Sequence, residues 1–220
     1  MVNQTLSEQI YDELYQDIIY QRLVCGQKLT LKVLKDRFNV SHTPIREALF
    51  RLSENGLVTY YSNCGVTVTE YTEEEIRQLY QFAAELDAMA VTFCQNNYNR
   101  IPLLLDLKEN IETAESLLKE ERNIEWKKYS EEFHKIFYRH ANNYYLDESA
   151  AKLRARLEVL SCMYYKNQNV EKIHKGHVAI YHKVKEGDFL SASNLMREHL
   201  QYDMVYALKA YAEYQSNHHS

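Results

Sequence analysis

Hydrophobic residues recur at helical intervals in three short segments at the start of the chain. The first, over residues 6–21, follows a capping box at Thr5 and predicts an amphipathic helix. The second covers residues 31–38 and ends at Asn39, a residue type that tolerates left-handed backbone conformations. The third starts with capping hydroxyls and a proline at residues 41–44 and ends before Gly56. The second and third segments therefore predict a helix, a tight turn and another helix.

The pattern then changes from helical spacing to two β-prone runs. Residues 57–61 and 66–69 flank a turn containing Asn63 and Gly65, which predicts a hairpin. From residue 72 to about 213 the helical spacing returns, with breaks that indicate about six helices. The low content of turn residues, 5 Gly and 2 Pro, argues against a β-sandwich or barrel. We predict a mainly α protein, with a winged helix-turn-helix over residues 1–70 and an all-helical bundle over residues 71–215.

Charge is unevenly distributed along the chain. The whole sequence has 26 Lys and Arg against 31 Asp and Glu, and the resulting net charge of −5 taken alone argues against nucleic acid as a partner. Residues 22–51, however, contain seven basic and two acidic residues, so this segment carries +5 and the remainder −10. Positive charge thus collects on the helix-turn-helix, as expected when that module contacts phosphates and the bundle does not.

The helix expected after residue 41 has one buried and one exposed face. Its buried face is marked by Ile45, Ala48, Leu49 and Leu52. This spacing turns Arg46 outward, and His42 and Thr43 stand before it at the helix N-terminus. Such a helix end can enter a major groove, where Arg46 would contact guanine or hold a phosphate. The alternative is a solvated charged face on a helical hairpin that binds no DNA, but the adjacent hairpin and the segregated charge favour DNA.

The segment that carries these features resembles the winged helix-turn-helix head of the GntR family of bacterial transcription regulators. The likeness covers residues 10–68 and is strongest over residues 40–49. It implies a dimeric repressor or activator in which two recognition helices read a short palindrome in double-stranded operator DNA. The family usually has Arg where this chain has His42, so base preference or affinity would differ at that position. The DNA-contacting positions that the resemblance implies are Lys32, Ser41, His42, Thr43, Arg46 and Gly65.

Three histidines of the helical segment, His134, His177 and His199, lie on or beside the apolar stripes of their helices. A single histidine in such a place is usually a core residue with satisfied hydrogen bonds. Three on separate helices would, if they converge, bind a borderline divalent metal such as Zn or Ni and leave positions open for water or a ligand carboxylate. The spacing by itself leaves the convergence open.

Residues 72 to about 210 resemble the FCD (FadR C-terminal domain), which follows the DNA head in one branch of the GntR family. The matching stretches lie around residues 133–143, 177–180 and 187–200. The resemblance implies a divalent metal that in turn holds a small carboxylate effector. The metal ligands that it implies are His134, His177 and His199, with Ser130 and Asn143 at the effector site.

Two departures from the family affect this site. The family has an Asp one turn before the first His, where this chain has Ser130, a weak neutral ligand, so Glu131 or water would complete the metal shell. Ala83 stands where many members have an Arg at the effector pocket. We expect the metal to be retained, because loss of one anionic ligand weakens a three-imidazole site without abolishing it. The alternative is a metal-free pocket for a neutral or fatty-acyl-like ligand.

An enzyme of another class is the remaining alternative. Glu131 with His134 and Glu171 with His174 have the Glu-x-x-His spacing of di-iron carboxylate bundles. That assignment requires an inward Glu from each of two further helices, and it leaves the basic winged head unexplained. The sequence contains no nucleophile motif, phosphate-binding Gly-rich loop or dinucleotide fingerprint. We therefore predict a regulator without enzymatic activity.

The four cysteines, at positions 25, 64, 94 and 162, are far apart and form no CxxC pair, which argues against a zinc finger or a dense disulfide framework. No apolar run approaches the roughly 18 residues needed to span a bilayer, and the first residues lack the layout of a signal peptide. We expect a cytoplasmic homodimer with no membrane partner. Its operator binding would be modulated by a small metabolite, such as an organic acid, bound in the bundle.

Overall fold

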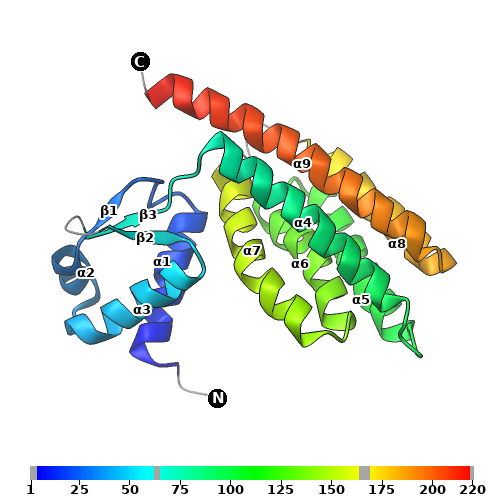
Figure 1. Ribbon diagram of the computed structural model, residues 1–220, viewed down its shortest axis with the longest axis horizontal. Helices are drawn as coiled ribbons and strands as arrows, with labels where there is room; N and C mark the ends of the chain where they lie inside the picture. Colours follow the sequence, from blue (N-terminus) through cyan, green and yellow to red (C-terminus); the bar gives the residue numbers. More distant parts are fainter. Residues whose placement is uncertain (1–3, 62–64, 164–168, 219–220) are drawn as a thin grey trace. The chain divides into compact units, whose positions relative to one another are not determined.

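The computed structural model describes residues 4–61, 65–163 and 169–218 and has the predicted mainly α fold (Figure 1). The chain divides into two compact units. The first unit comprises residues 1–72 and 151–165, and the second comprises residues 73–150 and 166–220. One helix, α7 (Tyr144–Met163), therefore contributes residues to both units.

The first unit begins with the three predicted helices, α1 (Leu6–Ile19), α2 (Leu31–Phe38) and α3 (His42–Glu54). The capping box that starts α1 is present, because the Thr5 hydroxyl accepts from the backbone N–H of Glu8 and the Glu8 carboxylate accepts from that of Thr5. α1 ends before the predicted residue 21, since Gln21 has a positive φ of 55°. Asn39 ends α2 in the left-handed region, as its residue type allows.

A three-stranded antiparallel sheet completes the wing, in the order β1-β3-β2. Strands β2 (Val58–Tyr61) and β3 (Gly65–Val68) form the predicted hairpin, while its turn at residues 62–64 lies outside the described residues. The sequence did not predict β1 (Lys28–Leu29), which pairs with Thr67 and Val66 of β3. A strand of two residues is too short to show the alternation of polar and apolar positions by which strands are recognised.

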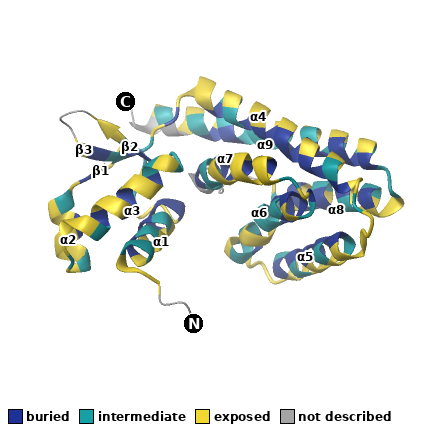
Figure 2. Ribbon diagram, turned by 60° about the horizontal axis from the view of Figure 1, so that its bottom comes forward, coloured by how far each residue is buried: buried dark blue, intermediate teal, exposed yellow. Residues whose placement is uncertain are grey.

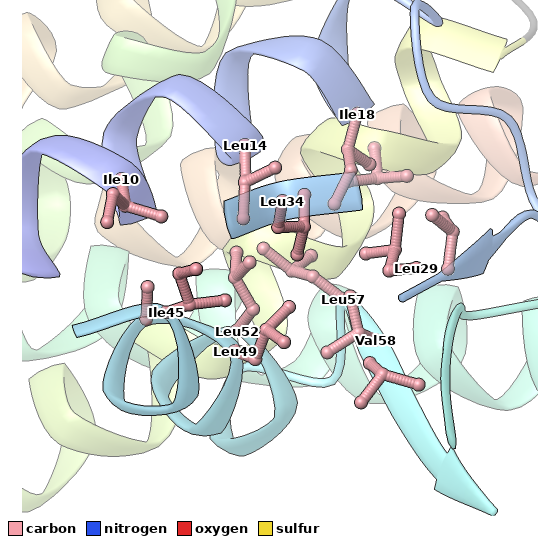
Figure 3. Close-up of a cluster of buried hydrophobic side chains, with 14 of the residues drawn as sticks. Ile10, Leu14, Ile18, Leu29, Leu34, Ile45, Leu49, Leu52, Leu57 and Val58 are labelled. Carbon is pink, nitrogen blue, oxygen red and sulfur yellow. The ribbon is translucent and has the colours of Figure 1, made fainter. Parts of the chain in front are cut away.

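Apolar side chains from all three helices and the sheet meet in one core in the first unit (Figure 3). Leu14 of α1, Leu34 of α2 and Leu49 of α3 point toward one another in this close-up. The buried face predicted for α3 is confirmed, because each of its residues is at most 1% exposed. The core therefore fixes the rotation of α3 and decides which of its side chains point outward.

The second unit is a helical bundle, and Figure 2 shows that its helices carry buried residues along one side and exposed residues along the other. Helices α4 and α9 lie side by side along the bundle, and α8 also packs against α9. Among the described residues, no helix is long and apolar enough to cross a membrane. Besides the start of α7, the described helices are α4 (Glu73–Cys94), α5 (Ile101–Lys119), α6 (Asn123–His140), α8 (Val170–Glu186) and α9 (Phe189–His218).

Candidate DNA interface and metal centre

The N-terminal turn of α3 presents polar side chains to solvent. Ile45 is fully buried, and this anchors the helix so that Ser41, His42, Thr43 and Arg46 are all exposed. The four residues are consecutive or one helical turn apart, so they share one end of the helix. The structure therefore places these four predicted residues on one surface.

The backbone at the start of α3 also faces solvent without the expected cap. Ser41 occupies the N-cap position with extended backbone angles, but its side chain makes no capping hydrogen bond. The prediction of a capping hydroxyl at this residue is therefore wrong. The first N–H groups of a helix have no partners within the helix and carry part of its positive dipole. A phosphate oxygen is a suitable acceptor for such groups.

The wing lies next to α3 within the first unit. Burial raises the pKa of Tyr60 on β2, and the positive charge of Arg46 on α3 opposes this shift. Gly65, at the start of β3, is exposed and has a φ of 91°, a conformation that favours glycine. Lys32 on α2 is exposed as well. These positions suit contacts to a nucleic-acid backbone beside the groove that α3 would enter.

Part of the positive charge of this segment is used inside the protein. Arg22 and Arg37 both bind the carboxylate of Asp17, each at 2.5 Å. Asp17 is only 3% exposed, and Arg37 also pairs with Glu13 at 2.5 Å. The +5 charge of residues 22–51 therefore overstates what DNA can meet, because two of the seven cations neutralise acids of α1.

Three buried histidines converge in the second unit. His134 comes from α6, His177 from α8 and His199 from α9, and none is more than 6% exposed. One nitrogen from each ring lies within 4.8 Å of the other two. The Nε2 atoms of His177 and His199 are 3.0 Å apart. The predicted metal ligands are thus brought together by helices that are distant in sequence.

A buried acid fixes the orientation of His134. Its Nδ1 lies 2.6 Å from Oδ2 of Asp87 on α4, and the hydroxyl of Tyr138 donates to the other carboxylate oxygen at 2.5 Å. A carboxylate accepts a hydrogen bond from an N–H group, and in the tautomer that carries its proton on Nδ1 the ring keeps the Nε2 lone pair for another partner. A histidine that binds a metal commonly donates its second N–H to a carboxylate in this way. Packing also holds His177, since Phe133 stacks on its ring with centroids 4.2 Å apart.

Sequence reasoning missed two residues that shape this centre. Asp87 is 1% exposed on the apolar face of α4. Acidic residues are seldom buried without a partner, so an aspartate within an apolar helical stripe is a sequence signal that could have identified this residue. Gly176 lies inside α8, where glycine is unfavourable and usually has a packing reason. A Cβ atom at Gly176 would lie 3.1 Å from Nδ1 of His199, so the glycine makes room for that ring.

The two predicted effector residues have different settings in this unit: Ser130 lies in the middle of α6, and Asn143 directly precedes α7. Ser130 is half-buried on α6, one turn before His134. Asn143 caps α7, because its side-chain oxygen accepts from the backbone N–H of Leu146 at 3.0 Å. Ala83, at the position where many family members have an Arg, is fully buried on α4. The structure thus gives Asn143 a structural role and leaves Ser130 beside the first histidine.

The residues of the di-iron alternative do not form one cluster. Among the described residues, the group that could hold a metal consists of His134, His177 and His199 and includes neither Glu171 nor His174. Glu171 is exposed in the first turn of α8. His174 is buried, and this burial lowers its pKa. The two Glu-x-x-His pairs therefore do not converge on one metal site.

The described cysteine side chains add no ligand to this centre. Burial raises the pKa of both Cys25 and Cys94 to about 12, and Cys94 donates to the carbonyl oxygen of Phe137. A thiol binds metal as the thiolate, so these two are unsuited to the role. Three imidazoles alone match the donors that Zn, Ni and related ions accept, and they leave coordination positions open.

Comparisons with known proteins agree with both parts of the chain. A model of the family described as bacterial regulatory proteins, gntR family, matches residues 6–68, and a model of the FCD domain matches residues 74–202. The chain is 22% identical to the uncharacterized HTH-type transcriptional regulator YdhC of Bacillus subtilis, over 89% of this chain and 88% of that protein. It is 23% identical to the HTH-type transcriptional repressor RspR of Escherichia coli, over 90% and 87%.

A solved structure shares the fold. Escherichia coli McbR/YncC superposes with a TM-score of 0.79 at 22% identity, and the match covers 95% of this chain and 100% of that chain. The matching families and named relatives are transcription regulators rather than enzymes. With family models that cover the winged head and most of the bundle, the chain belongs to the GntR family of bacterial regulatory proteins and carries an FCD domain.

Proposed function

We propose that this regulator binds a palindromic operator as a homodimer and that a small organic acid, bound in the helical bundle, changes its operator affinity. DNA binding is assigned to the winged head, residues 1–70, and effector binding and dimerisation to residues 71–215. The observation that carries the DNA part is the exposed start of α3, with Arg46 outward and no side-chain cap on its N–H groups. The observation that carries the effector part is the convergence of three buried imidazoles.

Each predicted DNA residue has a chemical task at the operator. Arg46 is long enough to donate two hydrogen bonds to a guanine edge, while Ser41 and Thr43 offer hydroxyls to phosphate oxygens. Lys32 supplies a positive charge from α2, and Gly65 lets the wing backbone approach the DNA closely. At His42 an imidazole, which can hydrogen-bond to a base edge or a phosphate, replaces the guanidinium that the family usually has there.

In the bundle, His134, His177 and His199 would hold a divalent ion, with Zn or Ni suited to a nitrogen donor set. Bound there, the ion would supply a positive centre that attracts the carboxylate of an organic acid. Ser130 lies one turn before His134 and offers a hydroxyl toward such a ligand, and Asn143 is the second residue assigned to the effector. Asp87 would keep His134 in the tautomer that leaves Nε2 available to the ion.

Binding in one unit affects the other only if the effector has unequal affinity for the DNA-binding and the non-binding state. α7 supplies residues to both units, so it is the described helix through which a change in the bundle would be transmitted. We propose repression as the outcome of operator binding, in keeping with the name of the relative RspR. A reporter placed behind the operator would rise in a strain that lacks the regulator.

The operator can be selected from a random duplex library and its affinity then measured by fluorescence anisotropy. Elemental analysis of protein purified without chelator reports the metal. Titration with simple mono- and dicarboxylic acids, in the presence and absence of that metal, should change operator affinity only when the metal is bound. Equal responses with and without metal would favour the metal-free pocket, and equal operator affinity for every acid would contradict the effector role.

A further inference from the structure

α9 carries an acid one turn beyond the third histidine of the triad. Asp203 follows His199 by four residues, so both side chains share a face of the helix. Oδ2 of Asp203 lies 3.7 Å from Nε2 of His199, and the Asp203 side chain is 17% exposed. The same Nε2 lies 3.0 Å from Nε2 of His177. The carboxylate therefore approaches the atom through which His199 faces the triad.

The two separations suit ligands of one ion. Bonds of about 2.0–2.2 Å from Zn to nitrogen or oxygen place neighbouring ligand atoms of a tetrahedral site about 3.4 Å apart. The distances of 3.0 Å to His177 and 3.7 Å to Asp203 fall on either side of that value. A nitrogen to oxygen distance of 3.7 Å is too long for a good hydrogen bond. Asp203 is thus placed as a neighbouring ligand of His199 would be. It lies outside the group of His134, His177 and His199, whose ligand atoms are all within 4.8 Å of one another, so its side chain would move toward the triad on ligation.

Charge balance favours the same assignment. A divalent ion bound only by neutral imidazoles would leave two positive charges in a buried site, and burying uncompensated charge is costly. Asp87 brings one negative charge through its hydrogen bond to His134, and Asp203 brings a second beside His199. Ser130, one turn before His134, brings none. Two carboxylates near the triad would therefore reduce the uncompensated charge of one divalent ion.

We infer that Asp203 is the fourth protein ligand of the metal, so that the donor set is His134, His177, His199 and Asp203. The inference rests on the metal of the proposed function. It assigns the anionic ligand to α9 rather than to Ser130 or Glu131 of α6. Asp87 has a separate, positioning role, because it contacts the Nδ1 atom of His134 that points away from the triad.

The test is the metal affinity of the full-length chain with Asp203→Asn, measured by competition with a chromophoric chelator for Zn²⁺. We expect the Zn²⁺ affinity to fall by more than 100-fold. Loss of a residue that only hydrogen-bonds to a metal ligand lowers metal affinity by about 10- to 100-fold, so a larger loss indicates a ligand. The absorption spectrum of the Co²⁺-loaded protein should change in band position and intensity, because the donor set changes. Glu198→Gln removes an exposed negative charge from the same helix and is the matched control, with both quantities unchanged.

A rescue variant separates ligation from general damage. An aspartate at residue 130 would share a face of α6 with His134. In the Asp203→Asn protein, Ser130→Asp should therefore restore at least tenfold of the lost Zn²⁺ affinity, whereas Ser130→Ala should restore none. Helical circular dichroism of each variant reports whether the bundle remains folded. Restoration by Ser130→Asp shows that the missing function is an anionic ligand.

An Asp203→Asn protein with Zn²⁺ affinity within threefold of the original and an unchanged Co²⁺ spectrum would overturn the inference and leave the metal proposal intact. Zn²⁺ uptake by the original chain and by its His177→Ala variant tests the metal proposal separately. If both take up equally little Zn²⁺, the triad holds no metal and the proposed metal site is wrong. The two failures are therefore distinguishable.

Discussion

Each unit of the regulator buries an aspartate, and the two acids are compensated differently. In the head, Asp17 is held between the guanidinium groups of Arg22 and Arg37. In the bundle, Asp87 is hydrogen-bonded to the imidazole of His134 and the hydroxyl of Tyr138. The head thus pairs its acid with two guanidinium groups, whereas the acid of the bundle is joined to a histidine of the triad.

This difference fits the proposed roles of a head that binds DNA and a bundle that binds a ligand. Arg22 and Arg37 bind Asp17 within the head, so part of their charge is neutralised by the protein itself. Asp87 acts through His134 on the triad, so a cation bound there is also stabilised by this carboxylate. Four changes test the comparison, in decreasing order of expected effect.

Arg46→Ala should abolish specific operator binding. Loss of a guanine contact costs about 1–3 kcal/mol of binding free energy, and each protomer of the proposed dimer loses one such contact. Operator affinity should therefore fall by at least about 30-fold. The fold should remain intact, because Arg46 is exposed. Anisotropy on the selected operator measures the loss, with Lys175→Ala, an exposed cation of α8, as the control. Unchanged binding by the Arg46 variant contradicts the assignment of α3 as the recognition helix.

Arg22→Ala with Arg37→Ala should destabilise the head by about 3 kcal/mol, because it leaves the buried carboxylate of Asp17 without its partners. The free energy of unfolding in urea measures this. Adding Asp17→Asn should recover part of the loss, since the unpaired charge is then removed. If the triple variant is no more stable than the double variant, the loss comes from packing of the arginines rather than from charge.

Asp87→Asn should lower Zn²⁺ affinity by about 10- to 100-fold, because an amide does not hold the Nδ1 proton of His134 as a carboxylate does. The measurement is chelator competition, with the exposed Glu85→Gln on the same helix as the comparison. In metal-free protein the free energy of unfolding should change far less than in the double arginine variant. If metal-free Asp87→Asn protein loses as much free energy of unfolding as the double arginine variant, the two buried acids do not differ in the way proposed.

His174→Asn should flatten the pH dependence of stability slightly. Burial lowers the pKa of His174 from its usual 6.5, with Glu115 opposing the shift in part. The unfolded chain then binds the proton more readily, so the free energy of unfolding falls as the pH drops below about 6.5. Urea midpoints at pH 7.5 and 5.5 for both proteins give the difference. An equal pH dependence in the two proteins would show that His174 contributes none of it.

Much of the head could be predicted because its signals are local. The capping box at Thr5, the left-handed Asn39 and the buried face around Ile45 each depend on residues within a few positions of one another. The same locality revealed the exposed start of α3. The strand β1 was missed because two residues carry no periodicity, and its partner β3 lies almost forty residues further along the chain. The absent cap at Ser41 shows that a favourable residue type does not ensure the hydrogen bond.

The sequence by itself determined the order of helices, the hairpin, the outward direction of Arg46 and the apolar setting of the three histidines, because periodicity depends on neighbours along the chain. Tertiary structure alone decided that Asp87, 47 residues before His134, meets it in the core, and that Gly176 makes room for His199. It also decided that Arg22 and Arg37 pair with Asp17. Such contacts depend on how helices pack, and the spacing of residues within one helix does not specify which side chains of another helix it meets.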